Sequence, residues 1–369
     1  RRRAGGALPG GRCQVKYLTV LGTRPEIITL SPLMPRLDEF GRHTIVHSGQ
    51  HYSAEMDAVF FRELELRAPD RLLRVGSLPP VEQVASIAAG VEAVIRDVEP
   101  DWVIVHGDTN TTLGGALAAA KYRAAGVRLA HVEAGARSFN DLQPEELNRV
   151  LVDRMSHLLF APTREDAANL AAEGVPAERV IVTGNTVVDA CTRMAALVDG
   201  DEPAGLRTHG YAVATLHRPE TVDVPDVLPR LWRALGDVAA LLPVVVLLHP
   251  RTRKMLDRFG VDPHAGGLDV REPVGYRDMI ALLKEARFCI TDSGGLQEEA
   301  AILAVPALVP RDATEHRRYV ASGLHRLTSP NGEGLALGID ETQVVEQGAV
   351  GGNGKCDAGS VAVGVGAYV

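Results

Sequence analysis

The feature that most constrains the fold is an alternation of short apolar runs with segments of helical periodicity, which occurs twice along the chain. The apolar runs are rich in β-branched residues, as buried strands are. They are VKYLTVLG, HTIVHSG, WVIVHGD, VRLAHVEAG, HLLFAPT and RVIVTGN in the first half, and YAVATLH, LPVVVLLHP, LDVREPV, RFCITDSGG and VPALVPRD in the second. Strands that are apolar throughout and alternate with helices predict parallel sheets covered on both faces.

A polar, glycine-containing stretch at 195–210 separates the two series and is the predicted linker. The 369 residues also suit two domains better than one core. We therefore expect two doubly wound Rossmann-like α/β domains, at 15–195 and 209–342. Their ligand should bind in the cleft between them, where the carboxyl ends of the strands meet. Residues 1–14 are expected to be a disordered leader, and 343–369 a tail for which a helix packed back on the N-terminal domain is one option.

Charge and hydropathy disfavour several functional classes. The net charge of -8 argues against a general nucleic-acid binder, because phosphate contacts need a basic face. No apolar run has the roughly 18 residues that a membrane span needs, and the basic start RRRAGGALPGGR lacks the apolar part of a signal peptide. The few cysteines are far apart, which disfavours a disulfide framework or a zinc site. We expect a cytoplasmic protein without nucleic-acid or membrane partners.

Polar side chains gather where the predicted strands end. Nearly every apolar run stops at a histidine, an acid or an arginine, in the motifs GTRPE, SGQH, HGDT, HVEAGAR, LHRPE, HPR, TDSGG and PRDATEH. Turns and helix caps use the same residue types. So many such motifs on one rim nevertheless favour an active cleft over capping alone.

The motif TDSGGLQEEA predicts a site for a nucleoside diphosphate. Ser293, Gly294 and Gly295 lie between a predicted strand and a helix. Side-chain-free residues at a helix N-terminus let backbone N–H groups approach an anion. Glu299, about one turn into the helix, is placed for the vicinal hydroxyls of a ribose. The alternative interpretation is an ordinary capped helix after a tight turn.

Known cofactor motifs do not occur. There is no GxGxxG after the first strand and no GxxxxGK[ST], which disfavours a dinucleotide site and a P-loop. His106 with Asp108, and His131 with Glu133, have period-2 spacing on strand ends and could ligate a metal. Neither pair has the helical spacing of HExxH. We expect no metal and no other cofactor.

The segment QPEELNRVLVDRMSH predicts a helix that begins at Pro144. Glu145 and Arg149 are four residues apart and share a face of it. They form either an ordinary surface ion pair or a carboxylate held in position toward the cleft.

Several acids are expected to converge on a sugar-sized space, namely Asp108, Glu133 and Glu145. Carboxylates with separated pKa values can supply a general base and a general acid. His217 and Arg24 can neutralise a departing diphosphate. The combination suits breaking a sugar–phosphate bond or moving a proton on the sugar.

These motifs resemble those of a known family. GTRPE, SGQH, HGDT, HVEAGARS, PEELNR, LHRPE, HP and TDSGGLQEEA, in this order from about Val15 to about Asp312, are similar to the motifs of the non-hydrolysing UDP-N-acetylglucosamine 2-epimerases. The resemblance implies a glycosyltransferase-B-type fold and a homodimer. It also implies reversible inversion of C2 of UDP-GlcNAc, giving UDP-ManNAc, by elimination of UDP to 2-acetamidoglucal and re-addition on the other face, without a redox cofactor or a metal.

The resemblance further implies roles for individual residues. The acid–base carboxylates would be Asp108, Glu133 and Glu145, and which of them takes the C2 proton stays open. The leaving diphosphate would be steadied by Arg24, Arg149 and His217. The phosphates and ribose would be held by Ser293, Gly294, Gly295 and Glu299. Many bacterial members are activated by a second UDP-GlcNAc, and the residues that match the region lining that site are Gln50, His51, Arg218 and His249.

The chain departs from the family pattern at three places. Thr29 stands where the family usually has a lysine, and Thr221 where it usually has an asparagine. The family's RDTTERPE is RDATEHRRY here, which makes four residues atypical: Ala313, His316, Arg317 and Arg318. Together these departures suggest an altered substrate, a specialised pathway or reduced activity. The alternative functions are a hydrolysing 2-epimerase that releases ManNAc and UDP, a glycosyltransferase of the same fold, and an inactive nucleotide-sugar sensor.

Overall fold

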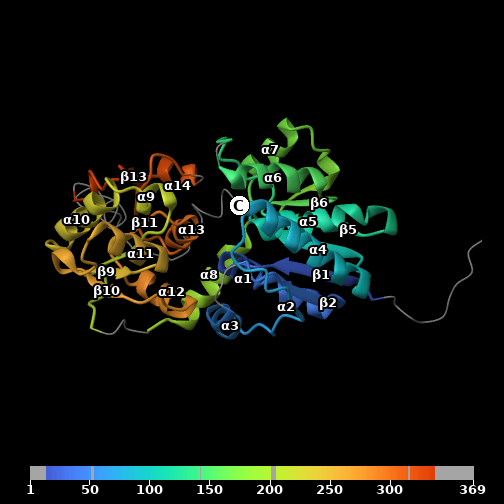
Figure 1. Ribbon diagram of the computed structural model, residues 1–369, viewed down its shortest axis with the longest axis horizontal. Helices are drawn as coiled ribbons and strands as arrows, with labels where there is room; N and C mark the ends of the chain where they lie inside the picture. Colours follow the sequence, from blue (N-terminus) through green and yellow to red (C-terminus); the bar gives the residue numbers. More distant parts are fainter. Residues whose placement is uncertain (1–13, 51–53, 142, 201–204, 315, 337–369) are drawn as a thin grey trace, which may run out of the picture.

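The computed structural model describes residues 14–50, 54–141, 143–200, 205–314 and 316–336. It contains two parallel sheets, each with helices on its faces, that lie side by side (Figure 1). The predicted fold class, two doubly wound Rossmann-like α/β units, is confirmed. Within the described part of the chain, no helix combines the length and the apolar character that crossing a bilayer requires.

The first sheet has seven strands, all parallel, in the spatial order β3-β2-β1-β4-β5-β6-β7. The order reverses between β1 and β4, which makes this pair the topological switch point. The strands are β1 (Lys16–Leu21), β2 (Arg42–His47), β3 (Arg71–Leu72), β4 (Trp102–His106), β5 (Arg128–Val132), β6 (Leu158–Ala161) and β7 (Val180–Val182).

The second sheet has six parallel strands in the order β10-β9-β8-β11-β12-β13, so its switch point lies between β8 and β11. The strands are β8 (Ala212–Thr215), β9 (Val244–Leu247), β10 (Asp269–Arg271), β11 (Phe288–Thr291), β12 (Ala307–Pro310) and β13 (His325–Thr328).

Helices connect the strands, as parallel pairing requires. The α-helices are α1 (Arg24–Leu30), α2 (Leu33–Phe40), α3 (Ala54–Glu63), α4 (Pro80–Val98), α5 (Asn110–Lys121), α6 (Pro144–Met155), α7 (Arg164–Ala172), α8 (Thr186–Leu197), α9 (Pro219–Val222), α10 (Leu228–Ala239), α11 (Pro250–Phe259), α12 (Tyr276–Lys284), α13 (Gly294–Ile302) and α14 (Arg317–Ala321). Short 3-10 turns are Arg123–Ala125, Ala177–Arg179 and Ala265–Gly267.

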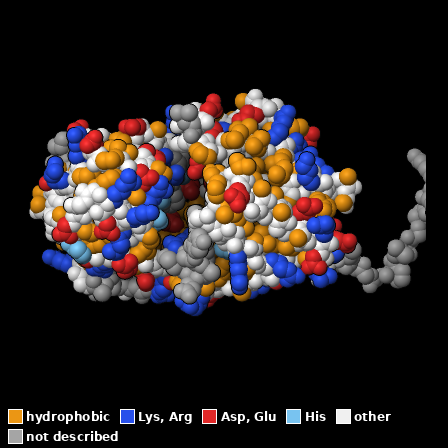
Figure 2. Space-filling model, in the orientation of Figure 1, with side chains coloured by type: hydrophobic (Ala, Val, Ile, Leu, Met, Phe, Trp, Pro, Cys, Tyr) orange, Lys and Arg blue, Asp and Glu red, His pale blue; other side chains and the backbone are white. Residues whose placement is uncertain are grey.

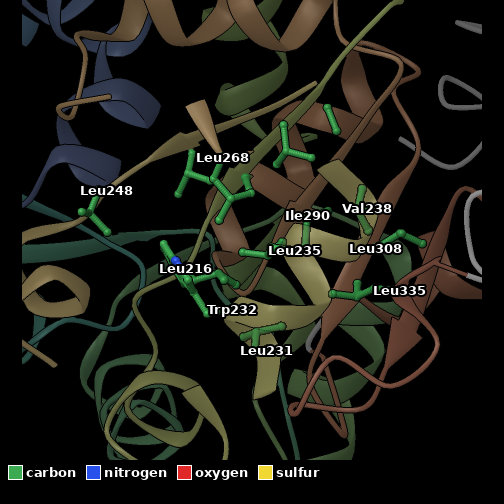
Figure 3. Packing of buried hydrophobic residues seen from close by; sticks show 14 of the residues in the cluster. Leu216, Leu231, Trp232, Leu235, Val238, Leu248, Leu268, Ile290, Leu308 and Leu335 are labelled. Carbon is green, nitrogen blue, oxygen red and sulfur yellow. The ribbon is translucent and has the colours of Figure 1, made fainter. Parts of the chain in front are cut away.

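Each sheet is buried on both faces, which explains the continuously apolar strands. In β1, Leu18 and Val20 pack into the cluster on one face of the sheet, and Leu21 packs into the cluster on the other. In the second sheet, Leu231 and Trp232 of α10 pack with Ile290 of β11 (Figure 3).

The two halves share an apolar cluster at α8. Ile28 of α1 and Met194 of α8 belong to the same cluster as Tyr276 and Ile280 of α12. Helix α8 lies between the two sheets in Figure 1. The ends of strands from the two sheets also come close together. Arg24, at the start of the helix after β1, is near enough to act by its charge on His249, which follows β9.

The predicted domain limits, 15–195 and 209–342, stay predictions, although all seven strands of one sheet fall inside the first and all six of the other inside the second. Helix α8 continues past position 195 to Leu197. The predicted tail at 343–369, nearly all of the leader at 1–14 and part of the linker lie outside the described residues.

Candidate active site

The four strands at the two switch points end in predicted site residues. β1 is followed by Thr23 and Arg24, and β4 ends just before Gly107 and Asp108. In the second sheet, His217 follows β8, and the TDSGG segment begins at Thr291, the last residue of β11. Figure 2 shows a hollow between the two halves, with acidic, basic and histidine side chains on its walls. The ligand position expected for doubly wound sheets therefore coincides with the predicted residues.

Glu26 joins the ends of β1 and β4. Its buried carboxylate accepts hydrogen bonds from the backbone N–H of Gly22 at 2.7 Å and of Thr23 at 2.8 Å. It also accepts one from the Thr109 hydroxyl at 2.7 Å, across to the N-cap of α5. Glu26 thus caps the start of α1 together with Thr23, and it fixes the two segments that carry Arg24 and Asp108.

Asp108 lies in an ion-pair network on α6. Arg149 forms an ion pair with Asp108 and another, at 2.9 Å, with Glu146. Glu146 in turn accepts from the backbone N–H of Ser138 at 2.9 Å. Burial raises the pKa of Asp108; the Arg149 guanidinium opposes this, and the charges of Glu133 and Glu145 add to it. Arg149, which was expected to pair with Glu145, connects Asp108 to Glu146, while Glu145 lies close enough to act on Asp108 by its charge.

Glu133 has the opposite electrostatic environment. It follows β5 in a left-handed backbone conformation, with φ of 67°, a region that a glutamate rarely occupies. Its Oε2 lies 3.1 Å from Nε2 of His106 and 3.4 Å from Nδ2 of Asn185. Burial opposes ionisation, but the hydrogen bond and charge of His106, together with the Arg149 charge, outweigh it and lower the pKa of Glu133 to about 2. Two nearby carboxyls thus have pKa values pushed apart, as an acid and a base require.

His131 is fully buried, and both of its ring nitrogens contact other protein groups. Its Nδ1 lies 2.6 Å from Asp153 Oδ1, and its Nε2 lies 2.8 Å from the carbonyl oxygen of Gly107. Arg137 completes this buried group through a 2.7 Å contact with Asp153. Members of the two pairs considered as possible metal ligands thus contact other side chains: His106 contacts Glu133, Asp108 contacts Arg149, and His131 contacts Asp153. Among the residues that the structure describes, no group of three or more His, Cys, Asp or Glu side chains is placed to hold a metal ion.

The second sheet contributes a cationic wall. Asp292 is fully buried and accepts from the backbone N–H of His217 at 3.0 Å and of Arg218 at 2.9 Å, which fixes the loop after β8. The ring centroids of His217 and His249 are 5.2 Å apart. Burial and the charges of Arg218 and Arg251 lower the pKa of His217 to about 4.

His249, in the second half of the chain, lies close enough to Arg24, in the first half, to be affected by its charge. Burial, the neighbouring His217 and the charge of Arg24 lower the pKa of His249 to about 4. Arg24 comes from the first sheet and His249 from the second, so both halves supply cations to one place. Neutral histidines among arginines form a preorganised site for an anion.

The TDSGG segment has the predicted strand–turn–helix form. Ser293 caps α13, and an added Cβ at Gly295 would meet nothing within 4 Å, which leaves the backbone open to a ligand. Glu299 is buried in the same helix. Burial raises the pKa of Glu299 to about 8, and the Tyr276 hydroxyl acts in the opposite direction.

The residues expected at a second nucleotide-sugar site divide between the halves. Gln50 accepts from the Thr111 hydroxyl at 2.7 Å, in the first sheet. Arg218 and His249 lie on the cationic wall of the second sheet beside His217. His51 lies outside the described residues. A regulatory role for this set stays a prediction.

Three of the atypical residues differ in burial and in contacts. Thr29 is 5% exposed within α1, and Thr221 is fully buried in α9. Arg318 lies 3.4 Å from Glu298 of α13. Glu298 also accepts from Asn185 at 3.3 Å, so the cation joins a chain of contacts that ends at Glu133.

Sequence reasoning missed three residues of this site: Asn185, Glu146 and Glu298. Asn185 caps α8 and touches a carboxylate of each half. Its position at the end of the run RVIVTGN was the available signal, because asparagine after a strand and before a helix is a capping pattern. Glu146 follows the predicted Glu145, and Glu298 precedes the predicted Glu299. Neither gave a signal of its own in the sequence.

Two Rossmann-like units with facing switch points, one rich in carboxylates and the other in cations, define a two-domain enzyme of the glycosyltransferase-B-type fold. The sequence model of the UDP-N-acetylglucosamine 2-epimerase family matches residues 36–347. A UDP-N-acetylglucosamine 2-epimerase of Methanococcus maripaludis is 40% identical over 80% of this chain and 83% of its own length. The chain belongs to the UDP-N-acetylglucosamine 2-epimerase family.

Two further relatives bear on the substrate. A UDP-2,3-diacetamido-2,3-dideoxy-D-glucuronate 2-epimerase of Pseudomonas aeruginosa is 39% identical, covering 85% of this chain and 88% of that protein. The crystal structure of Methanocaldococcus jannaschii UDP-GlcNAc 2-epimerase in complex with UDP-GlcNAc and UDP superposes with a TM-score of 0.82 at 39% identity. The superposition covers 88% of this chain and 92% of the Methanocaldococcus chain.

Proposed function

We propose that the protein inverts C2 of UDP-N-acetylglucosamine, or of a close nucleotide-sugar relative. The reaction eliminates UDP to give 2-acetamidoglucal and adds UDP back after the proton returns to the other face of C2. The observation that carries the proposal is the division of charge across the cleft. Asp108 and Glu133, with pKa values shifted in opposite directions, lie in one half, and the other half presents the neutral rings of His217 and His249 among arginine charges.

In this reaction the first sheet handles the sugar proton. Glu133 is held ionised and is the better candidate for accepting the C2 proton, since Asp108 has the raised pKa of a group that keeps its own proton. Glu145 lies within electrostatic reach of Asp108 and completes the acidic wall. Arg149 holds Asp108 in place through their ion pair.

The second sheet holds the nucleotide. The N-terminus of α13, at Ser293, Gly294 and Gly295, offers backbone N–H groups to a phosphate. The protonated Glu299 carboxyl can both donate to and accept from ribose hydroxyls. His217 and Arg24 neutralise the diphosphate as the C1–O bond breaks.

A diacetamido uronic acid linked to UDP is a second candidate substrate. The Pseudomonas relative is named for it at an identity equal to that of the Methanocaldococcus enzyme. A sugar carboxylate needs a cation near the sugar end of the cleft. Arg318 stands where the family pattern has a glutamate, and the contacts through Glu298 and Asn185 connect it to Glu133.

We further infer a homodimer formed through the exposed face of α6. Leu147 is 61% exposed, and Leu151, one turn along, is 40% exposed. Val150 and, on the neighbouring helix α5, Leu117 extend this apolar surface. Exposed apolar side chains gathered on adjacent helices are typical of interfaces between copies of a chain.

One experiment tests the activity directly. The protein is incubated with UDP-GlcNAc in D2O, and the sugar is followed by proton NMR. We expect UDP-ManNAc carrying deuterium at C2. Free ManNAc with UDP would indicate the hydrolysing reaction, and no turnover with intact UDP binding would favour a transferase or a sensor. The same measurement with the diacetamido uronic acid substrate ranks the two sugars.

A further inference from the structure

His106 is a buried histidine whose side chain, within the described part of the chain, has one hydrogen bond, which joins it to Glu133. It is the last residue of β4, it is 5% exposed, and its Nε2 lies 3.1 Å from Oε2 of Glu133. Its Nδ1 is buried without a hydrogen-bond partner among the described residues. Buried polar atoms without partners are rare in folded proteins and are tolerated where function requires the group.

The position of the Glu133 side chain is not set by the strand that precedes it and depends on contacts with neighbouring residues. β5 ends at Val132, so the strand no longer directs the next side chain. The backbone of Glu133 is left-handed, a strained conformation for a residue with a side chain, which persists only where the surroundings fix it. His106 and Asn185 both converge on Oε2. This leaves Oε1 as the oxygen available to a sugar in the cleft.

The charges around the pair favour an imidazolium–carboxylate contact. Glu26 from α1, Asp108 after β4 and Glu133 after β5 all act on His106. Burial alone would disfavour the charged ring, but the hydrogen bond and charge of Glu133 outweigh it and raise the pKa of His106. Arg149 of α6 and His316 before α14 also act on Glu133 by their charge and lower its pKa further.

We propose that His106 is a positioning residue for proton transfer at C2: its Nε2 donates to Oε2 of Glu133, fixes the direction of the carboxylate and keeps it ionised for its work on the sugar. This inference rests on the proposed function only in assigning Glu133 to the sugar. His106 itself touches no reacting atom. The hydrogen-bonded pair exists in the protein without any substrate.

Two substitutions separate the hydrogen bond from the charge. His106→Phe keeps a ring of similar shape and removes both, while His106→Gln keeps an N–H donor without the charge. His264→Phe, at an exposed histidine, is the matched control. The measurements are kcat and KM for UDP-GlcNAc across a pH range, and the Kd of UDP as a check on folding and on the nucleotide half.

We expect His106→Phe to lower kcat by about 100-fold, the low end for loss of an acid–base contribution, with KM and the UDP Kd within about twofold. His106→Gln should recover about tenfold of that loss, or ~1.4 kcal/mol, since it restores a hydrogen-bond donor to the carboxylate. In both variants the acid limb of kcat should move to higher pH, because Glu133 loses the influence that lowers its pKa. A kcat within about threefold of wild type in His106→Phe, or an equal loss in both variants together with lost UDP affinity, would overturn the proposal.

A second readout needs no turnover. In protein labelled with 15N-histidine, the His106 resonances are identified by their loss in His106→Gln. We expect both ring nitrogens to have imidazolium shifts at neutral pH, and to become those of a neutral ring in Glu133→Gln. A neutral ring in the wild-type protein would refute the pairing. An imidazolium in a protein that turns over no nucleotide sugar would refute the proposed function and leave the pairing intact.

Discussion

Binding of UDP should be accompanied by proton uptake at His217 and His249. In the free protein both rings are neutral at pH 7, because burial and neighbouring positive groups lower the pKa of each to about 4. Arg218 acts on the first ring and Arg24 on the second. A bound diphosphate would place negative charge among these cations and reverse the balance.

The size of the effect follows from Coulomb's law. One phosphate charge about 4 Å from an imidazolium contributes ~4 kcal/mol at an effective dielectric constant of about 20. At about 1.4 kcal/mol per pKa unit, this raises the pKa by about 3 units, from about 4 to about 7. Each ring then takes up roughly half a proton at pH 7, so the pair takes up about one proton for each UDP bound.

Isothermal titration calorimetry measures this uptake. Titrations with UDP at pH 7 in buffers of different ionisation enthalpy give the number of protons as the slope of the observed enthalpy. Since protons enter on binding, UDP affinity should rise as the pH falls through about 7 and level off near the free-protein pKa of about 4. His217→Asn and His249→Asn should each remove about half of the uptake. A slope of zero, or proton release, would refute a diphosphate lying against these rings.

Three further outcomes follow from the site and the surface. Glu133→Gln should abolish deuterium incorporation at C2 while leaving UDP affinity unchanged, and normal exchange would contradict its assignment. Thr29→Lys should raise kcat/KM for UDP-GlcNAc by about tenfold, or ~1.4 kcal/mol, which is the low end for a hydrogen bond to a charged group. The control variant Thr29→Met should not raise it. Equal kcat/KM values in the two variants would contradict this prediction. Replacing Leu147 and Leu151 by Glu should convert the dimer to a monomer in sedimentation analysis, while Leu241→Glu, at a residue 65% exposed in the other half, should not. A persistent dimer would place the interface elsewhere.

The sequence missed two strands, β3 and β13, each at one edge of its sheet, whereas the edge strands at the opposite sides, β7 (Val180–Val182) and β10 (Asp269–Arg271), lie within predicted apolar runs. β3 (Arg71–Leu72) has two exposed residues, and β13 (His325–Thr328) reads HRLT, with a polar residue at three of four positions. Edge strands need not be apolar on both faces, because one side is not covered by a neighbouring strand. Their pairing is decided by the rest of the sheet, which a local pattern does not contain.

The strand ends were predictable as a site, but the partners within it were not. The spacing of His106 and Asp108 suggested side chains on one face, a rule that holds only while the strand continues. Gly107 has a φ of 67° and turns the chain, so His106 contacts Glu133 while Asp108 contacts Arg149. The backbone turn that separates them is the kind of conformation that glycine supplies and that residue spacing alone does not reveal.

The separation of charge between the two sheets also determines how a nucleotide sugar can enter. With the diphosphate against His217 and His249, the uncharged sugar meets Asp108 and Glu133. In the reverse orientation the diphosphate would lie against ionised Glu133, with a repulsion of ~4 kcal/mol for each charge pair about 4 Å apart. Arg24 strengthens the preference, because it brings a cation of the first sheet to the phosphate side. The same field holds the released UDP in place while the glycal is free, and re-addition depends on that retention.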